Sequence, residues 1–279
     1  MKNKLLDLSL IISIYDGVKL NLLIKSLNSI SNQSHHPKEV LVMLDGVKRS
    51  DIRFVVNAFK SKHSNVKIFY NKKNLGISDS YNILLKKCKY SLVAIHDADD
   101  ISYSKRFFKQ YQYLKINNNI TVLGSSVVEN FYYIKKKILK KSEVNEKKLY
   151  KKIYFFNPIN HPTVMFKRDV ILDFKYKKFF RMEDYYLWIR LILNKYRVKN
   201  IKEPLVEMNF DKDSVSRRTG IKVWINDLRI QFFLLKNKPL NIFIFLFMII
   251  GKSFYHIIPN FLKEKIRFFF INFFTKFVN

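Results

Sequence analysis

Three carboxylates lie within four positions of a strongly basic chain, in the segment KYSLVAIHDADDIS at residues 89–102. Asp97, Asp99 and Asp100 follow an apolar run, and their like charges repel one another. Four arrangements would use such a group: a divalent-cation site, a phosphorylated aspartate, a paired acid and base, or capping of the next helix. Capping of the next helix would account for one carboxylate, Asp100, because helix-forming residues begin near Ser104; the alternative partner for Asp100 is a metal-bound water. Mg²⁺ and Mn²⁺ prefer oxygen ligands, and Mg²⁺ sites commonly join one or two carboxylates to substrate phosphates, so a cation site is favoured.

A second acidic pair, Glu183 and Asp184, opens the segment EDYYLWIRLILNKY. The apolar residues of this segment recur at helical spacing, which predicts a helix with Trp188 in the core. Carboxylates at a helix start are stabilised by the helix dipole, so the pair has a structural explanation as well as a catalytic one.

Alternating strand and helix patterns position these acidic residues. Short apolar runs predict buried strands at 8–15, 39–45, 65–70 and 91–96, and amphipathic helices are predicted between them. This alternation indicates βαβ units and a parallel sheet, in which ligands bind beyond the carboxyl ends of the strands. The polar strand ends at Tyr15, Asp45, Asn74 and Asp97 are therefore expected to line one pocket.

The later part of the chain is less regular. A helix over 104–115 and a strand over 120–129 are predicted, and residues 131–152 are expected to form a solvated loop or helix. The single cysteine, Cys88, excludes an internal disulfide framework and a cysteine-rich zinc site, and it is expected to be a buried, inert thiol. The N-terminus is interpreted as a buried strand and not as a signal peptide, which predicts a cytoplasmic protein.

The net charge of +30 requires a physical explanation. Residues 221–279 contribute +7, so most of the excess is spread over residues 1–220, which fits attraction to anionic surfaces better than a sequence-reading groove. The apolar run 242–250 is too short to span a bilayer. Basic residues around Phe-rich faces predict that 221–279 is a helical tail in the interface of an anionic membrane. The alternative is packing on the main domain or on a second subunit.

The ordered motifs resemble the family-two glycosyltransferases, which have the GT-A fold, an α/β architecture with a mostly parallel central sheet. The resemblance spans roughly residues 8–220, and it is closest to bacterial enzymes of the amylovoran and O-antigen type. It implies a nucleotide-sugar half at about 1–103 and an acceptor half at about 104–220. The motifs are SIYDG (13–17), MLDG (43–46), NLGISDSYN (74–82), DADD (97–100), HPTVMF (161–166), MEDYYLWIRL (182–191) and SRRTG (216–220).

The resemblance implies roles for the donor-side motifs. Tyr15 and Asp16 would lie against the nucleotide base, Asp45 would hydrogen-bond the uracil or ribose, and Asn74 would be close to the nucleotide. In the acidic cluster, Asp97 would lie near the ribose and the metal, and Asp99 would bind Mn²⁺ or Mg²⁺.

The resemblance also implies an inverting mechanism with Asp184 as general base and Glu183 as the second candidate. An acceptor hydroxyl needs such a base as it attacks the anomeric carbon, and the metal stabilises the diphosphate leaving group. Arg217 and Arg218 are candidate diphosphate clamps, although a basic surface loop explains them nearly as well. His161 is a candidate contact to acceptor or diphosphate, with a structural histidine as the alternative.

The expected activity is transfer from a nucleotide-diphosphate sugar, with UDP favoured, to an undecaprenyl-diphosphate-linked glycan at the inner face of the plasma membrane. An acceptor such as lipooligosaccharide core or protein is an alternative. A basic nucleic-acid-binding protein is a rival class, but no such motif is present, and nucleic acid is not expected as a partner. A nucleotide-sugar pyrophosphorylase would usually carry a Gly-rich basic loop after the first strand, and SIYDGVKLN is not one.

Overall fold

The computed structural model describes residues 4–212, 214, 217, 220–237 and 242–258. The first half has the predicted alternation of strands and helices. In chain order its elements are β1 (Lys4–Ile14), α1 (Leu20–Ser31), β2 (His35–Asp45), α2 (Ser50–Lys62), β3 (Val66–Asn71), α3 (Ile77–Lys87) and β4 (Leu92–Ile95). The four strands are parallel in the order β3-β2-β1-β4, so their carboxyl ends meet at one edge, as predicted.

The second half extends the same sheet with mixed pairing. Antiparallel β8 (Met165–Lys167) joins β4 to β6 (Ile120–Phe131), and β9 (Arg197–Phe210) runs parallel to β6. The complete path is β3-β2-β1-β4-β8-β6-β9-β5, with β7 paired to β6. The remaining elements are β5 (Ile101–Ser102), α4 (Arg106–Ile116), η1 (Tyr132–Ile134), β7 (Lys136–Lys140), α5 (Glu146–Lys152), η2 (His161–Thr163), α6 (Arg168–Phe174) and α7 (Glu183–Leu193).

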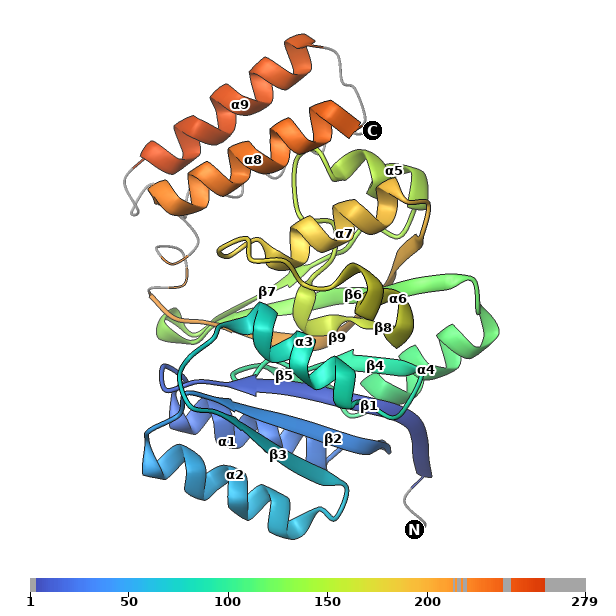
Figure 1. Cartoon of the computed structure of the whole chain (residues 1–279), viewed down its shortest axis with the longest axis vertical. Helices are drawn as coiled ribbons and strands as arrows, with labels where there is room; N and C mark the ends of the chain where they lie inside the picture. Colours follow the sequence, from blue (N-terminus) through green and yellow to red (C-terminus); the bar gives the residue numbers. More distant parts are fainter. Residues whose placement is uncertain (1–3, 213, 215–216, 218–219, 238–241, 259–279) are drawn as a thin grey trace.

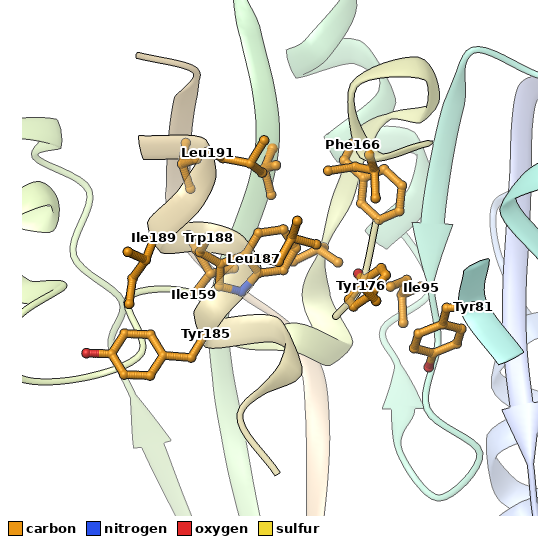
Figure 2. Packing of buried hydrophobic residues seen from close by; sticks show 14 of the residues in the cluster. Tyr81, Ile95, Ile159, Phe166, Tyr176, Tyr185, Leu187, Trp188, Ile189 and Leu191 are labelled. Atoms are coloured by element: carbon orange, nitrogen blue, oxygen red, sulfur yellow. The ribbon is translucent and has the colours of Figure 1, made fainter. Parts of the chain in front are cut away.

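Each face of the sheet carries its own hydrophobic core, because successive side chains of a strand point to opposite faces. On β1, Leu10 and Ile12 belong to the core under α1 and α2, whereas Ile11 belongs to the core under α3 and α7. Figure 1 shows α1 and α2 beside β1 to β3 at the N-terminal end of the molecule. Trp188 is fully buried in the second core, as predicted, beside Tyr185, Leu187 and Ile189 of the same helix (Figure 2).

Two helices, α8 (Ile221–Asn237) and α9 (Ile242–Ile257), form a hairpin at the end of the molecule far from the N-terminus (Figure 1). Ile230 and Leu234 of α8 are fully buried in the core that contains Trp188, so α8 packs on the main body. In α9, Lys252 forms a 2.7 Å ion pair with Asp227 of α8. Within the described ranges, no helix combines the length and apolarity needed to cross a bilayer.

One local prediction changes in the structure and another is confirmed. Residues 131–152 contain strand β7 as well as helix α5, because the 136–140 segment pairs with the edge of β6. Cys88 ends α3 and is buried, and burial raises the pKa of its thiol to about 12, which confirms an inert thiol.

Candidate functional site

The acidic cluster forms the tight turn between β4 and β5. The backbone N–H of Asp100 donates to the carbonyl of Asp97 at 3.2 Å, which closes the turn. Asn209 of β9 holds it from the other side: its backbone N–H donates to Oδ1 of Asp100 at 2.9 Å, and its Nδ2 donates to the carbonyl of Asp99 at 2.6 Å. Asp100 is buried, whereas Asp97 and Asp99 are only partly buried. Two of the three carboxylates therefore remain accessible to a ligand.

The predicted capping role of Asp100 is wrong. Helix α4 begins at Arg106 with Lys105 at its N-cap, and no side chain caps it. The Asp100 carboxylate instead accepts a hydrogen bond from β9, a strand 109 residues further along the chain. The pairing of β5 with β9 brings this backbone N–H beside the turn.

A buried arginine lies beneath the acidic turn. Arg106 donates to the carbonyl of Ile95 at 2.7 Å and to Oγ of Ser102 at 2.8 Å. Burial lowers the pKa of its guanidinium to about 9, and the charges of Asp97 and Asp100 offset part of this effect. The guanidinium is still charged at neutral pH, so it compensates part of the repulsion within the cluster.

His96 lies directly before the turn and is fully buried. Its Nε2 contacts Oγ of Ser26 at 2.7 Å, and its Nδ1 contacts Oγ of Ser102 at 2.9 Å. Ser26 donates onward to the carbonyl of Asp97, so its oxygen can accept from the imidazole N–H. Burial, followed by the charge of Arg106, lowers the pKa of His96 to about 3. A neutral imidazole therefore joins α1, β4 and β5 under the site.

Because His96 is buried in its neutral form, we expect the protein to lose stability in acid. The pKa of His96 is lower in the folded state than in the unfolded chain, where it is about 6.5. Its contribution is therefore complete above pH 6.5 and declines by about 1.4 kcal/mol per pH unit as the pH falls toward 3. We expect the free energy of unfolding to fall less between pH 7 and pH 5 in His96→Gln, by up to about 2 kcal/mol. Urea unfolding at both pH values measures this difference, and equal slopes in the two proteins would contradict it.

The predicted nucleotide-side residues lie at the same sheet edge, but two of them have structural partners. Asp45 is buried, and its two oxygens accept from the backbone N–H groups of Leu75 and Gly76 at 3.0 and 2.9 Å. Asn71 donates to the same carboxylate at 2.7 Å. Asp45 therefore shapes the loop that carries Asn74, whose exposed side chain accepts from the N–H of Gly76.

Gly46 makes this close approach of loops possible. Its φ of +67° favours glycine, and a Cβ atom there would lie 2.3 Å from the backbone nitrogen of Asn74.

The other predicted donor residues belong to the loop after β1. Asp16 accepts from the N–H groups of Lys48 and Arg49, at 2.9 and 3.1 Å, and so ties this loop to the start of α2. Tyr15 is exposed at the rim, where a planar ligand can reach its ring.

The second acidic pair begins α7 and is oriented by a residue outside that helix. Asn157 Nδ2 donates to Oδ2 of Asp184 at 2.6 Å, which leaves the other oxygen of the carboxylate to act elsewhere. Burial and the neighbouring charge of Asp184 raise the pKa of Glu183. The two carboxylates therefore differ: Asp184 is held by an amide donor, and the pKa of the Glu183 carboxyl is raised by burial.

His161 lies between the two acidic groups. Its Nδ1 is 3.9 Å from Oδ1 of Asp97, and its Nε2 is 3.3 Å from the hydroxyl of Tyr176. Its ring also packs against Tyr81 and Trp188, at centroid distances of 5.6 and 6.3 Å. His161 thus joins the acidic turn to the α7 side of the site.

Two tyrosines that the sequence did not single out complete this bridge. Tyr81 donates from its hydroxyl to Oδ1 of Asp97 at 3.1 Å, and Tyr176 interacts electrostatically with both Asp97 and Asp184. Burial, followed by these carboxylates, raises the pKa of both hydroxyls well above 10, so they act as hydrogen-bond donors. Tyr81 lies within the motif at residues 74–82, so the sequence pattern could have pointed to it. No motif marks the other site residues found only in the structure, which are Tyr176, Asn157, Arg106 and Asn209.

Of the two candidate arginine clamps, Arg217 is held by a carboxylate. Arg217 donates to both oxygens of Asp211, at 2.8 and 3.2 Å, in the segment that follows β9. Although burial raises the pKa of Asp211, hydrogen bonds from Arg217 and Ser214 outweigh it and lower the value to about 2. Arg217 is thus engaged in an ion pair, while Arg218 lies outside the described residues.

The donor set fits a divalent cation held jointly by protein and substrate. Asp97 and Asp99 supply hard carboxylate oxygens at the sheet edge, and the Asp97 side chain is 27% exposed. Within the described part of the chain, no group of three or more His, Cys, Asp or Glu side chains is arranged as a metal site. Mg²⁺ is commonly bound by one or two carboxylates together with substrate phosphates, so two accessible aspartates are a suitable protein contribution.

Comparison with known proteins agrees with this fold. Among solved structures, the chain resembles that of S. aureus TarS 1–349 in complex with UDP-GlcNAc, with a TM-score of 0.62 and 17% identity over 88% of this chain and 70% of that one. A longer TarS structure is matched over 44% of its length. A mannosyltransferase from Pyrobaculum calidifontis, in complex with GDP-Man and Mn²⁺, gives a TM-score of 0.60 at 12% identity, with coverage of 91% and 70%. These likenesses define a GT-A-like fold.

Sequence comparison defines the family. Residues 9–174 match Glycosyl transferase family 2. The chain is 29% identical to the UDP-Gal:alpha-D-GlcNAc-diphosphoundecaprenol beta-1,3-galactosyltransferase of Escherichia coli, over 90% of this chain and 91% of that protein. It is 34% identical to the O-antigen biosynthesis glycosyltransferase WbnJ of Escherichia coli, over 69% and 76%. The chain belongs to glycosyl transferase family 2 and is a glycosyltransferase.

Proposed function

We propose that the protein is an inverting, metal-dependent glycosyltransferase that moves a sugar from a UDP-sugar to a lipid-linked glycan acceptor. One observation carries this proposal: two acidic groups lie on either side of His161 and Tyr176. The first is the accessible pair Asp97 and Asp99 at the sheet edge, and the second is the pair at the start of α7. The first pair suits a cation and a diphosphate, and the second suits a base. The solved structures with UDP-GlcNAc and with GDP-Man and Mn²⁺ support the donor class.

On the donor side, Asp99 and Asp97 would hold Mn²⁺ or Mg²⁺, which supplies charge stabilisation for the departing diphosphate. Tyr15 and Asn74 are both exposed; Tyr15 would contact the base, and Asn74 would contact the nucleotide. Asp45 and Asp16 act on the nucleotide through the loops that they hold, because their carboxylates already accept backbone hydrogen bonds. Arg217 would reach the diphosphate only if it left Asp211, and Arg218, the other proposed clamp, lies outside the described residues.

On the acceptor side, Asp184 takes the proton of the attacking hydroxyl. Asn157 fixes one carboxylate oxygen and leaves the other for the acceptor. A single base and in-line attack on the face opposite the diphosphate invert the anomeric configuration. Glu183, whose carboxyl pKa is raised by burial, is the second candidate, because it adjoins Asp184 at the start of the same helix.

The proposed acceptor is a sugar linked to undecaprenyl diphosphate, in synthesis of an O-antigen, capsule or exopolysaccharide repeat unit. Its support is the E. coli relative with 91% coverage, whose name gives such an acceptor. In this proposal residues 1–220 form the catalytic domain. The appendage over 221–279, of which the structure describes 221–237 and 242–258, places the enzyme at the inner face of the plasma membrane.

The α9 helix carries a stripe suited to that surface. Ile242, Leu246, Ile250 and Phe254 recur every four residues and are exposed, whereas Phe245 and Met248 are buried. Apolar helix faces next to Lys and Arg bind anionic bilayers through buried area and charge together.

We expect the protein to sediment with vesicles that contain phosphatidylglycerol, and Ile250→Glu/Phe254→Glu to lose most of this binding. Both residues are more than half exposed, so the substitutions leave the core unchanged. Phe54→Glu is the matched control, because Phe54 is 74% exposed on α2 in the other half of the molecule. Equal sedimentation of the double variant and the wild type would contradict this role of α9.

A donor screen tests the proposed function directly. UDP-, GDP- and dTDP-sugars are incubated with a polyprenyl-diphosphate-linked sugar, with and without Mn²⁺ or Mg²⁺, and nucleotide release is measured. The expected result is metal-dependent release from a UDP-sugar, with an inverted linkage in the product by NMR. Transfer that is unaffected by chelation, or that retains configuration, would reject the mechanism.

A further inference from the structure

A groove of about 360 Å³ opens beside the carboxylate pair, a size typical of small-molecule sites. We call it the α8 groove. Three segments line it: the start of α3, the loop that precedes α7 together with the first residue of α7, and helix α8. Its lining residues are Leu75, Gly76, Ile77, Ser78, Lys178, Phe180, Glu183, Asn226 and Arg229. Glu183 places the groove directly next to Asp184.

Helix α8 is a fixed wall of this groove. Ile230 and Leu234 anchor it in the main core, and Phe233 packs against Tyr186 of α7 at a centroid distance of 5.1 Å. Asn226 is buried, and its Nδ2 donates to the carbonyl of Phe180 at 3.3 Å, which joins α8 to the loop before α7. Packing of α8 on the main core therefore fixes the positions of Asn226 and Arg229, the two residues of α8 that line the groove.

The charges of the groove are unequally distributed. Lys178 is paired with Asp79 at 2.7 Å, so much of its charge is already compensated. Arg229 is exposed and contacts the neutral side-chain oxygen of Asn226 at 3.3 Å, and within the described ranges no carboxylate is placed within ion-pair distance of it. Arg229 thus presents an uncompensated guanidinium to the groove, while Ile77 and Phe180 supply apolar surface.

We propose that the α8 groove binds the diphosphate of the acceptor, with Arg229 as its principal contact and Lys178 as a second cation. The inference rests on the proposed function, in which the acceptor hydroxyl meets Asp184. The acceptor sugar then occupies the Glu183 end of the groove, and the phosphates on its far side extend toward α8. A guanidinium binds phosphate oxygens through two parallel N–H donors, which suits this position.

This site is separate from the donor diphosphate site at Asp97 and Asp99. The donor site is acidic and requires a cation, whereas the α8 groove supplies its own positive charge from Arg229. The two sites therefore respond differently to chelation, and this difference makes the proposal testable.

The test compares Arg229→Gln with Lys236→Gln, which removes the same charge from an exposed position on the same helix. The first assay measures KM for a polyprenyl-diphosphate-linked sugar and for an alkyl glycoside of the same sugar. We expect Arg229→Gln to raise KM for the diphosphate acceptor by about 10- to 100-fold, the loss of a charged hydrogen bond, and to leave KM for the alkyl glycoside and for the UDP-sugar within about twofold. Lys236→Gln should match the wild type. Equal KM changes for both acceptors, or no change, would overturn the proposal.

A second measurement does not depend on catalysis. Binding of farnesyl diphosphate is measured by calorimetry in the presence of EDTA, so that the donor site lacks its cation. We expect binding by the wild type and Lys236→Gln, and binding at least about 10-fold weaker by Arg229→Gln. If transfer to alkyl glycosides occurs but Arg229→Gln binds farnesyl diphosphate normally, this inference alone fails. If no transfer occurs with any acceptor while the Arg229-dependent binding persists, the proposed function fails and the anion site stands.

Discussion

Replacement of Asp184 by asparagine is expected to lower kcat by about 10²- to 10⁴-fold, the usual contribution of a general base. The amide has nearly the same shape, and its oxygen can still accept from Asn157, which lies 2.6 Å from Oδ2 in the native protein. It cannot accept the proton of the attacking hydroxyl. The variant should therefore keep its fold and its affinity for UDP while transfer is lost.

Three measurements separate this loss from damage to the structure. Thermal unfolding and UDP binding should match the wild type, and single-turnover transfer should show the loss in the chemical step. Glu183→Gln is the control on the neighbouring carboxylate and should have a smaller effect, because Asp184 is the carboxylate that Asn157 orients and the proposed base. Full transfer by Asp184→Asn, with loss in Glu183→Gln, would reverse the assignment of the base.

The second large effect is expected at the acidic turn. Asp99→Asn should lower kcat/KM by at least about 100-fold, because charge stabilisation of the leaving diphosphate is typically worth 10²- to 10³-fold. Asp99 is partly exposed, and the turn is held through its backbone carbonyl by Asn209. Removal of the side-chain charge should therefore weaken the cation and leave the turn in place.

The neighbouring aspartate provides the matched control. Asp100→Asn removes a charge one position away, but the native carboxylate is buried and accepts a backbone hydrogen bond from Asn209. We expect this variant to lose thermal stability and to keep the Mn²⁺ dependence of UDP binding, whereas Asp99→Asn should keep stability and lose that dependence. Titration of UDP with and without Mn²⁺ distinguishes the two, and the same metal response in both variants would refute the separate roles.

The half of the molecule that contains the parallel strands was predictable from residue patterns. Apolar runs at 8–15, 39–45, 65–70 and 91–96 are all strands, and their parallel pairing brings Tyr15, Asp45 and Asp97 to one edge. This was predictable because periodicity and strand alternation are local properties of the chain. The same reasoning placed Glu183 and Asp184 at the start of a helix, with Trp188 in the core.

The partners of the polar side chains were not predictable in this way, because they come from distant parts of the chain. Asp100 is paired with a strand 109 residues away, and Arg217 is held by Asp211 instead of facing a ligand site. Arg229, which no motif marks, lines the groove beside Glu183 because burial of α8 in the main core brings it there. Such contacts depend on how distant segments pack, and residue spacing along the chain carries no information about that packing.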